Sequence, residues 1–295
     1  MGQVEESPVI GVIGGSGVYD IEGLEKREWR EIVSPFGKPS DALLFGELDG
    51  QKLVFLPRHG RGHVLSPSDL NFRANIDALK RAGVTEILSV SAVGSLHEDL
   101  PPGHFVLVDQ FLDRTFKRET SFFGEGLVAH VSLAHPTCNR LGDHLAAALT
   151  ELSIPHTRGG TYLAMEGPQF STLAESKLYR SWGCDVIGMT NMPEAKLARE
   201  AELCYASVAM VTDYDCWHPD HDHVTVEAIV KVLLANADKA RALVRAVAPR
   251  LAGRTSNCEA GCHRVLDTAV ITAPEKRAPE MVERLSAVAG RVLTA

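Results

Sequence analysis

The sequence predicts an α/β fold with a mixed central sheet flanked by helices. Short apolar runs typical of buried strands alternate along the chain with amphipathic patterns typical of helices. Several of the runs end in glycine, serine or charged residues, as strands do where they meet a loop. With 295 residues, 45% of them hydrophobic, the chain is long enough to bury a large core. These observations together favour a sheet covered by helices.

The strand-like runs are short, apolar and bounded by turns, which favours buried strands over helices. Strands are predicted at residues 9–13, 52–56, 86–92, 185–188 and 205–211. The first run opens into a glycine-rich turn, the second into Pro57-Arg58-His59-Gly60, and the third into Gly94-Ser95. We therefore expect polar loops at the ends of neighbouring strands.

Helical spacing fills most of the remaining chain. Helices are predicted at residues 68–82, 141–152, 171–182, 194–202, 226–247 and 279–292. In the first of them, Leu70, Ala74 and Ala78 recur on one face, and Gly83 is a typical stop. We expect one main domain over residues 1–252. Residues 253–295 are expected to form a linker and a helical extension packed on the same domain.

Charge and hydropathy limit the classes of partner. The formal net charge of −8 argues against nucleic acid or an anionic membrane surface as the main partner. No apolar run approaches the roughly 20 residues that a membrane helix needs. Residues 1–6 lack the basic and apolar blocks of a secretory signal. We therefore expect a cytoplasmic protein with a small-molecule ligand and no nucleic-acid or membrane partner.

The cysteines are expected to be reduced thiols, several of them beside apolar segments where cysteine packs as a small hydrophobe. They are Cys138, Cys184, Cys204, Cys216, Cys258 and Cys262. The run from Cys258 to Cys262 and His263 has spacing that suggests a metal clip. A structural zinc needs four ligands, however, and a fourth is not evident nearby in the sequence. We therefore predict no metal.

Two carboxylates, Asp213 and Asp215, follow the apolar run 205–211 directly. Because side chains alternate along a strand, this spacing places both on one face of the sheet. Carboxylates beside a buried strand must pair, accept hydrogen bonds or take up a proton. The pattern predicts a raised pKa for at least one of them and a group able to protonate a leaving group. A competing interpretation is that Thr212 and Asp213 cap a following helix.

Three strand ends carry groups that suit an oxyanion. Ser16, in the glycine-rich turn, offers a hydroxyl among exposed N–H groups. Arg58 allows bidentate recognition and His59 can donate beside it, while Ser91 adds another hydroxyl. A plain tight turn and a surface salt bridge are the competing interpretations of the first two motifs. Because ligands gather at the carboxyl ends of strands in open α/β sheets, we predict one phosphate site there.

The motifs around these residues, taken in order, resemble the trimeric purine nucleoside phosphorylase family, in particular its members that cleave 5′-methylthioadenosine. The match runs between residues 9 and 233. It rests on Gly14-Gly15-Ser16-Gly17, Pro57-Arg58-His59-Gly60, Asn75-Ile76-x-Ala78-Leu79, Gly94-Ser95-Leu96, Asp109-Gln110-Phe111-x-Asp113-Arg114-Thr115, Met165-Glu166-Gly167-Pro168-x-Phe170-Ser171, Gly188-Met189-Thr190 and Thr212-Asp213-Tyr214-Asp215-Cys216-Trp217.

The resemblance implies a nucleoside phosphorylase-like single domain that converts 5′-methylthioadenosine to adenine and 5-methylthioribose 1-phosphate. Phosphate would attack C1′ while Asp213 assists purine departure at N7. An aspartate there also implies 6-aminopurines, because relatives that prefer 6-oxopurines usually carry Asn. The resemblance further implies a homotrimer, no cofactor, and inorganic phosphate as a co-substrate.

The site residues that the resemblance implies fall into three sets. The phosphate-binding residues are Ser16, Arg58, His59, Ser91, Ala92 and Thr190. The substrate-binding residues are Phe170, which would stack on the base, Met189, which would lie against the ribose, and Asp213 and Asp215. The specificity residues are Ser171, Val226 and His130, the last bordering the 5′ pocket of a neighbouring subunit.

Three alternatives stay open at this point. A purine nucleoside or 5′-methylthioinosine phosphorylase would share nearly all of the phosphate-binding residues. A hydrolytic nucleosidase would use water, which leaves the Arg58-His59 group without a purpose. A non-catalytic purine-binding module would not need both an oxyanion group and an acid beside the base. The alternatives predict different substrates or a different dependence of cleavage on added phosphate.

Overall fold

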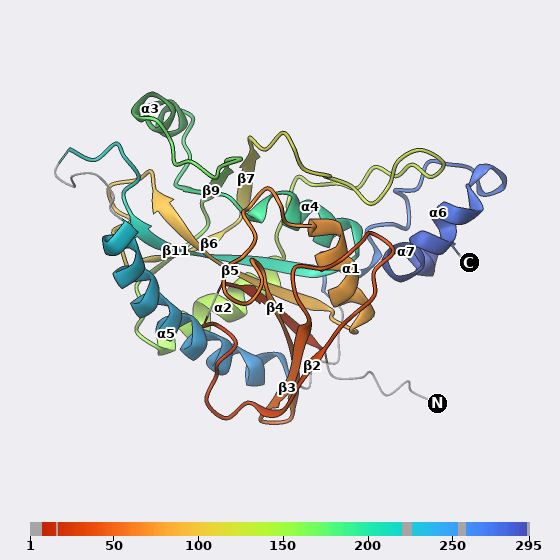
Figure 1. The fold of residues 1–295 in the computed structure, drawn as a ribbon, viewed down its shortest axis with the longest axis horizontal. Helices are drawn as coiled ribbons and strands as arrows, with labels where there is room; N and C mark the ends of the chain where they lie inside the picture. The colour runs from red at the N-terminus through yellow and green to blue at the C-terminus, as the bar shows by residue number, and fades with distance from the viewer. Residues whose placement is uncertain (1–7, 16, 220–225, 253–257, 294–295) are drawn as a thin grey trace.

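The central feature of the fold is one mixed sheet with helices on both faces (Figure 1). The computed structural model describes residues 8–15, 17–219, 226–252 and 258–293. The strands are β1 (Ile10–Gly14), β2 (Glu25–Arg30), β3 (Leu43–Leu48), β4 (Gln51–Pro57), β5 (Glu86–Ser95), β6 (Phe105–Val108), β7 (Gln110–Asp113), β8 (His156–Arg158), β9 (Thr161–Ala164), β10 (Val186–Gly188) and β11 (Cys204–Asp213). The helices are α1 (Phe72–Arg81), α2 (Asn139–Glu151), α3 (Leu173–Ser181), α4 (Asn191–Glu200), α5 (Val226–Leu251), α6 (Pro279–Arg284) and α7 (Ser286–Leu293), with short 3-10 turns η1 (Cys262–Arg264) and η2 (Pro274–Lys276).

Strand β5 lies at the centre of the sheet and makes it branch. Its first half pairs in parallel with β1 on one side, and nearly its whole length pairs in parallel with β11 on the other. Its last two residues pair antiparallel with β10, so the sheet continues from there through β9 to β7. The other branch runs from β11 through β6 to β8. The mixed sheet predicted from the sequence is therefore confirmed.

Strand β11 separates two apolar layers. Val208 and Met210 face a layer that includes residues of α2 and α5, whereas Ala209 and Val211 face one that includes residues of α1, α4 and α7. All four side chains are buried, as expected for a strand covered on both faces. The carboxyl end of β11, which carries the candidate acid, is thus held on a strand that is packed from both sides.

The C-terminal extension packs on the main domain rather than forming a separate core. Leu285, Val288 and Ala289 are buried in the same apolar layer as α1. The single helix predicted at 279–292 is wrong in detail, because the chain forms two helices that meet at the fully buried Leu285. Helix α6 begins at Pro279, a residue that suits the first helical position.

The predicted strands and the other predicted helices are all present, with shifted ends. The strands that the sequence pattern missed are β2, β3 and β6 to β9. Strand β2 reads Glu-Lys-Arg-Glu-Trp-Arg and is exposed throughout, so it carries no apolar pattern. Strands β6 to β9 have only three or four residues each, which is too short to show a period.

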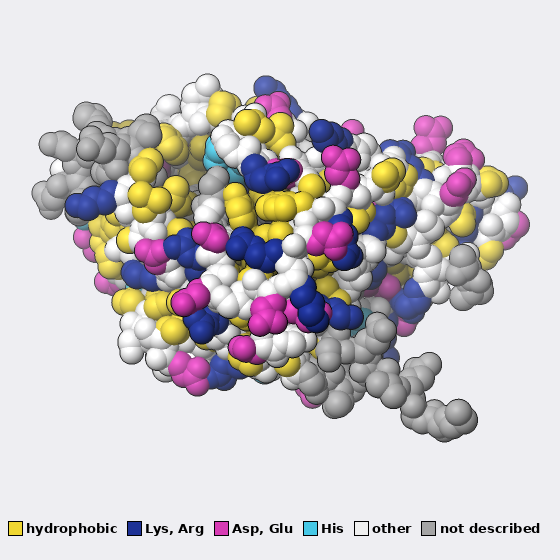
Figure 2. Space-filling view, turned by 60° about the horizontal axis from the view of Figure 1, so that its bottom comes forward, with side chains coloured by type: hydrophobic (Ala, Val, Ile, Leu, Met, Phe, Trp, Pro, Cys, Tyr) yellow, Lys and Arg dark blue, Asp and Glu magenta, His cyan; other side chains and the backbone are white. Residues whose placement is uncertain are grey.

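The distribution of charged side chains on the surface is relevant to the expected partners. Figure 2 shows one face on which Lys and Arg side chains alternate with Asp and Glu, with apolar side chains between them. This face has no continuous basic stripe of the kind that tracks a nucleic-acid backbone. Among the described helices, none combines the length and the apolar character needed to cross a membrane.

Candidate active site

A cavity of about 390 Å³ opens where the carboxyl ends of β1, β4, β5, β10 and β11 converge. Ligands gather at this edge in open α/β sheets. The side chains and backbone that line it include Gly15, Arg58, His59, Ser91, Ala92, Gly94, Phe170, Met189, Thr190, Asp213 and Asp215. The cavity therefore brings together most of the residues singled out in the sequence, from five strand ends and the loops that follow them.

Arg58 is buried beneath the cavity, with 2% of its surface exposed, so the interpretation as a surface salt bridge is wrong. Its Nε and Nη2 donate to the two carboxylate oxygens of Glu194 at 2.9 and 3.2 Å. Nη2 also donates to the Ser89 hydroxyl at 2.6 Å, and Nη1 to the Val90 carbonyl at 3.0 Å. The bidentate partner of Arg58 is thus a protein carboxylate. Among the described residues, one of its five N–H groups, on Nη1, has no partner and remains for a ligand.

Glu194 is the centre of a buried polar network that sequence reasoning missed. Besides Arg58, it accepts hydrogen bonds from Ser89 and Tyr205, at 2.5 and 2.9 Å. Asn191 donates to the same Ser89 hydroxyl and to the Tyr205 hydroxyl. Burial acts to lower the pKa of Arg58, but the charge of Glu194, the hydrogen bonds to it and the nearby tyrosines together raise that pKa. No sequence motif predicts this network, because its members lie on β5, α4 and β11 and come together only in the fold.

His59 lines the cavity as a neutral group. Its Nδ1 lies 2.9 Å from the Leu65 carbonyl, and since a carbonyl only accepts, we assign the proton to Nδ1. Burial and the charge of Arg58 lower the pKa of His59 to about 4. The sequence-based expectation was that His59 donates to an oxyanion, but in this neutral form its one N–H is directed at Leu65. Nε2 is instead an acceptor, suited to the hydroxyl of a protonated oxyanion.

Ser91, Ala92 and Thr190 complete the oxyanion side of the cavity. Ser91 is buried on β5, and its hydroxyl lies 3.5 Å from the Asn191 amide oxygen, a long and weak contact. Thr190 directly precedes α4 and is also buried. Its backbone N–H donates to the Tyr162 hydroxyl at 3.4 Å, which is again a long contact. Both Ser91 and Thr190 line the cavity, so their hydroxyls can turn toward a ligand.

Asp213 and Asp215 line the same cavity, and no helix begins in residues 213–219, so the capping interpretation is wrong. Strand β11 ends at Asp213, so strand alternation does not place Asp215. Asp215 reaches the cavity through a turn in which its own φ is +53°. The sequence predicted that Asp213 and Asp215 lie together. The cause, however, is this turn and not the alternation of side chains along a strand.

The two carboxyl groups differ in their surroundings. Asp213 accepts from the Thr212 hydroxyl at 2.7 Å and from the Asp215 amide at 2.8 Å. Burial nevertheless raises the pKa of Asp213 above its usual value. Burial, with a contribution from the charge of Asp213, raises the pKa of Asp215 to about 6. Its Oδ2 is buried without a hydrogen-bond partner among the described residues. Both groups are therefore able to hold a proton that a solvated aspartate would lose.

The remaining predicted site residues are placed as follows. Phe170 is 62% exposed at the mouth of the cavity. Ser171 does not line the cavity, but its hydroxyl contacts the sulfur of Met165, which does. His130 is exposed and does not line the cavity, and its backbone N–H donates to the Ala269 carbonyl. Ser16 and the side chain of Val226 lie outside what the structure describes.

The cavity also has apolar lining that the sequence did not single out. Met165, Ile187, Met210 and Leu233 contribute to it, from a loop, β10, β11 and α5. They have ordinary apolar surroundings in the sequence, so no local signal marks them. They make one part of the cavity apolar, which suits an apolar substituent of a ligand.

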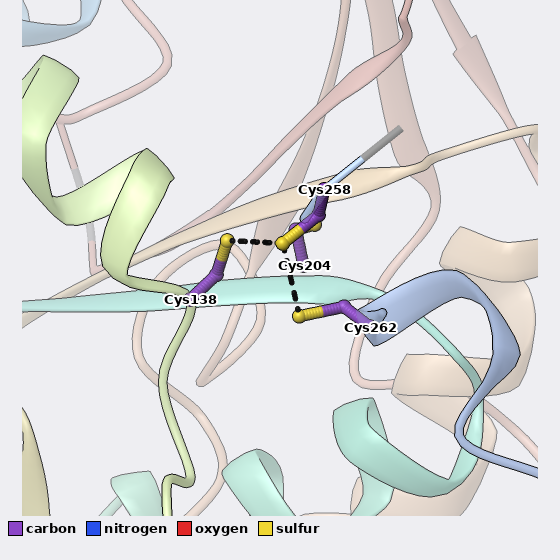
Figure 3. A group of neighbouring side chains, drawn as sticks. All are labelled: Cys138, Cys204, Cys258 and Cys262. Atoms are coloured by element: carbon purple, nitrogen blue, oxygen red, sulfur yellow. Dashed lines mark hydrogen bonds between the residues drawn. The ribbon is translucent and has the colours of Figure 1, made fainter. Parts of the chain in front are cut away.

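The expectation that Cys258 and Cys262 lack further ligands is wrong. The fold places Cys138 and Cys204 beside them, and the four sulfur atoms lie within 4.8 Å of one another (Figure 3). The first two cysteines are more than 50 residues away from the second pair in the chain, so the sequence alone gives no sign of the cluster. It is separate from the cavity described above.

Comparison with known proteins gives a consistent family. Residues 9–249 match the model of the phosphorylase superfamily. The chain is 70% identical to a protein from Rhodospirillum rubrum named S-methyl-5′-thioadenosine phosphorylase, over 99% of this chain and all of that protein. It is 63% identical to a protein of the same name from Cereibacter sphaeroides, over 97% of this chain and 98% of that one.

Solved structures agree with this. A crystal structure of a methylthioadenosine phosphorylase from an antarctic soil metagenomic library superposes with a TM-score of 0.90 at 45% identity, over 96% of this chain and 99% of that chain. A methylthioadenosine phosphorylase from Schistosoma mansoni in complex with adenine gives a TM-score of 0.83 at 38% identity, over 88% of this chain and 98% of that one. The present chain is thus similar to them over nearly its whole length.

Proposed function

The chain belongs to the phosphorylase superfamily, and from this premise we infer that it is an enzyme that cleaves S-methyl-5′-thioadenosine with inorganic phosphate. The products are adenine and 5-methylthioribose 1-phosphate. The observation that carries the inference is that one cavity joins an oxyanion-binding group to two carboxyl groups with raised pKa values. A site for hydrolysis by water has no use for the first of these groups.

We propose that phosphate binds among Arg58, His59, Ser91 and Thr190, with the Ala92 backbone and Ser16 as further contacts. The free Nη1 N–H of Arg58 and the two hydroxyls donate to phosphate oxygens, while neutral His59 accepts from a phosphate hydroxyl. The charge of Arg58 also attracts the anion. Its pairing with Glu194 fixes the guanidinium in place, so the site does not reorganise when phosphate arrives.

The reaction then follows from charge. A phosphate oxygen forms a bond to C1′ while the bond from C1′ to N9 breaks, and its electron pair moves into the purine. The ribose gains positive charge on the way, which the bound phosphate anion stabilises. Asp213 donates its proton to N7, so that adenine leaves as a neutral molecule. Asp215 lies beside it and orients the base. The proposed reaction needs no cofactor.

Substrate preference is proposed to come from two features. Asp213, once ionised, accepts a hydrogen bond from the 6-amino group of adenine, which a 6-oxopurine lacks. A mismatched buried group costs about 1 to 3 kcal/mol, or one to two decades of discrimination. The apolar lining near the cavity suits a methylthio group better than a 5′-hydroxyl. We propose that Phe170, at the cavity mouth, stacks on the base, and that Ser171 and Val226 help to set specificity.

Adenine release by the purified protein tests the function directly. We expect cleavage of methylthioadenosine to require added phosphate, and to proceed faster than cleavage of adenosine, inosine or 5′-methylthioinosine. The second product is identified as the sugar 1-phosphate by phosphorus NMR. Cleavage that is indifferent to phosphate contradicts the phosphorylase assignment, and preference for the inosine compounds contradicts the role of Asp213.

Gly167 offers a test of the proposed contact between Met189 and the ribose. Its φ is +69°, and a Cβ at this position would collide with the Met189 sulfur. We expect Gly167→Ala to displace Met189 and raise KM for methylthioadenosine about tenfold, which corresponds to about 1.4 kcal/mol. Gly183→Ala is the matched control, because Gly183 has φ +76° with open space around it. Equal effects of the two substitutions on KM would contradict the contact.

We also propose that the protein acts in the cytoplasm as a homotrimer. The free cysteines fit a reducing compartment. Apolar side chains are exposed on loops, with Val64 and Phe116 each 75% exposed, and Val64 is next to His63, which lines the cavity. A neighbouring subunit that covered them would also bring its own residues, His130 among them, toward the 5′ end of the substrate. Light scattering tests this assembly, and a monomeric mass contradicts it.

A further inference from the structure

Four buried cysteines meet on the side of the sheet that α2 and α5 cover (Figure 3). Cys138 directly precedes α2, Cys204 is the first residue of β11, and Cys262 begins η1. Cys258 lies at the start of the described C-terminal extension. None of the four is more than 4% exposed. The cluster plays no part in the proposed reaction, yet it joins the extension to the main domain.

The distances between the sulfur atoms are compatible with a metal site. The sulfur of Cys258 lies 3.5 Å from that of Cys138 and 3.6 Å from that of Cys262. Four sulfurs placed tetrahedrally around zinc at about 2.3 Å are about 3.8 Å apart. A disulfide would need a sulfur–sulfur distance of about 2.05 Å. All six distances lie within 4.8 Å, so small movements of the side chains bring the four sulfurs to the corners of a tetrahedron.

Positive charge is arranged around the cluster. Arg199 is buried and directs Nη1 at the Cys262 sulfur at 3.4 Å. Arg140 directs Nη2 at the Cys204 sulfur at 3.6 Å. Zinc with four thiolates carries two negative charges in total. Arg199 offsets part of this charge, whereas the charge of Arg140 is shared with Glu86, to which its Nη2 donates at 2.5 Å. A cluster of four neutral thiols would gain little from two arginines, since neutral sulfur is a weak acceptor.

The cluster also has an access route. Cys204 and Cys258 line a second cavity, of about 170 Å³, together with Glu202, His263 and Arg291. Charged and polar side chains line part of this cavity, so a hydrated cation can approach the sulfurs through it. Once four thiolates surround the metal no open coordination position remains, which is the arrangement of a structural rather than a catalytic site.

We propose that Cys138, Cys204, Cys258 and Cys262 bind one structural zinc ion. The metal fastens the C-terminal extension to the starts of α2 and β11. In a reducing compartment such a bond is durable where disulfides are not. The inference rests on the cysteine cluster alone and does not depend on the proposed reaction.

Metal analysis of the untagged protein, purified without chelators, is the first test. We expect about one zinc per chain, and binding of about one Co²⁺ after the zinc is removed under reducing conditions. Four thiolates around Co²⁺ give intense sulfur-to-cobalt charge-transfer absorption and the visible bands of tetrahedral cobalt. Absence of stoichiometric zinc together with failure to bind Co²⁺ in this way overturns the proposal. Two disulfides, found as a loss of four hydrogens in the intact mass with no metal, overturn it as well.

Cysteine variants test which residues bind the zinc ion. In Cys258→Ser/Cys262→Ser we expect the zinc content and the cobalt charge-transfer absorption to be lost. Cys184→Ser is the matched control, because Cys184 is buried and free but lies outside the cluster, and it should keep both. Chelation should lower the Tm of the wild type and of Cys184→Ser by the same amount. Retention of zinc in the double variant overturns the assignment, and the wild-type cobalt spectrum decides the question even if that variant does not fold.

Discussion

Replacing Asp213 by asparagine is expected to lower kcat/KM for methylthioadenosine by about 10²- to 10⁴-fold, the usual contribution of a general acid. Asparagine has nearly the same shape, and its single oxygen can still accept from the Asp215 amide, while its NH2 group replaces the oxygen that accepts from the Thr212 hydroxyl. It has no acidic proton for N7, so adenine must leave as an anion or take its proton from water. Initial rates of adenine release at saturating phosphate measure the effect.

The dependence of the rate on pH separates the loss of an acid from a loss of shape. A carboxyl group must hold its proton to donate it, so wild-type kcat/KM should fall as pH rises through the raised pKa of the acid. Asp213→Asn should lack this limb of the profile. Asp215, whose pKa burial raises to about 6, is the neighbouring carboxyl that could produce the same limb. If Asp215→Asn removes the limb and Asp213→Asn keeps it, the assignment of the acid to Asp213 is wrong.

Selectivity provides a second readout for the same variant. An asparagine side chain can donate to a purine O6, which an ionised aspartate cannot. We therefore expect the ratio of kcat/KM for methylthioadenosine to that for 5′-methylthioinosine to fall in Asp213→Asn. A general weakening of the fold would lower both values and leave the ratio unchanged.

Much of the fold and of the candidate site could be predicted from the sequence. The buried strands and the site residues at their ends are both marked by local patterns. Buried strands such as β1, β4, β5 and β11 carry continuous apolar runs, and the residues that follow such runs necessarily reach the same edge of a sheet. Arg58, Ser91 and Asp213 were found in this way, and the cavity does bring them together. Strand β2, by contrast, has no apolar residue pattern and is held by its pairing with β3.

Partners distant in sequence could not be predicted. Glu194 decides the state of Arg58, but it lies 136 residues away in a helix whose sequence resembles any other. His59 has its donor bound by the Leu65 carbonyl, a contact that depends on the conformation of one loop. The four cysteines meet because α2, β11 and the C-terminal extension converge, which local spacing cannot show. In each case the decisive interaction is a tertiary one.

Removing the Arg58 side chain should strongly destabilise the protein. Arg58→Met leaves Glu194 buried, with 2% of its surface exposed and no counter-ion. Breaking a buried pair from one side costs about 3 to 5 kcal/mol in the free energy of unfolding. Urea denaturation measures this. Arg61→Met is the matched control, because Arg61 pairs with Asp41 at the surface, and its effect should be far smaller.

A double-mutant cycle shows whether this cost comes from the unpaired charge. In Arg58→Met/Glu194→Gln neither charge remains, while the glutamine oxygen can still accept from Ser89 and Tyr205. We expect the double variant to be more stable than Arg58→Met, yet to bind phosphate as weakly, with a similarly raised KM for phosphate. This result would separate stability from phosphate binding. The Arg58–Glu194 pair stabilises the fold because the two charges neutralise each other. Phosphate is bound instead by the N–H of Arg58 that does not contact Glu194. Additive losses of stability in the two single variants would contradict this division.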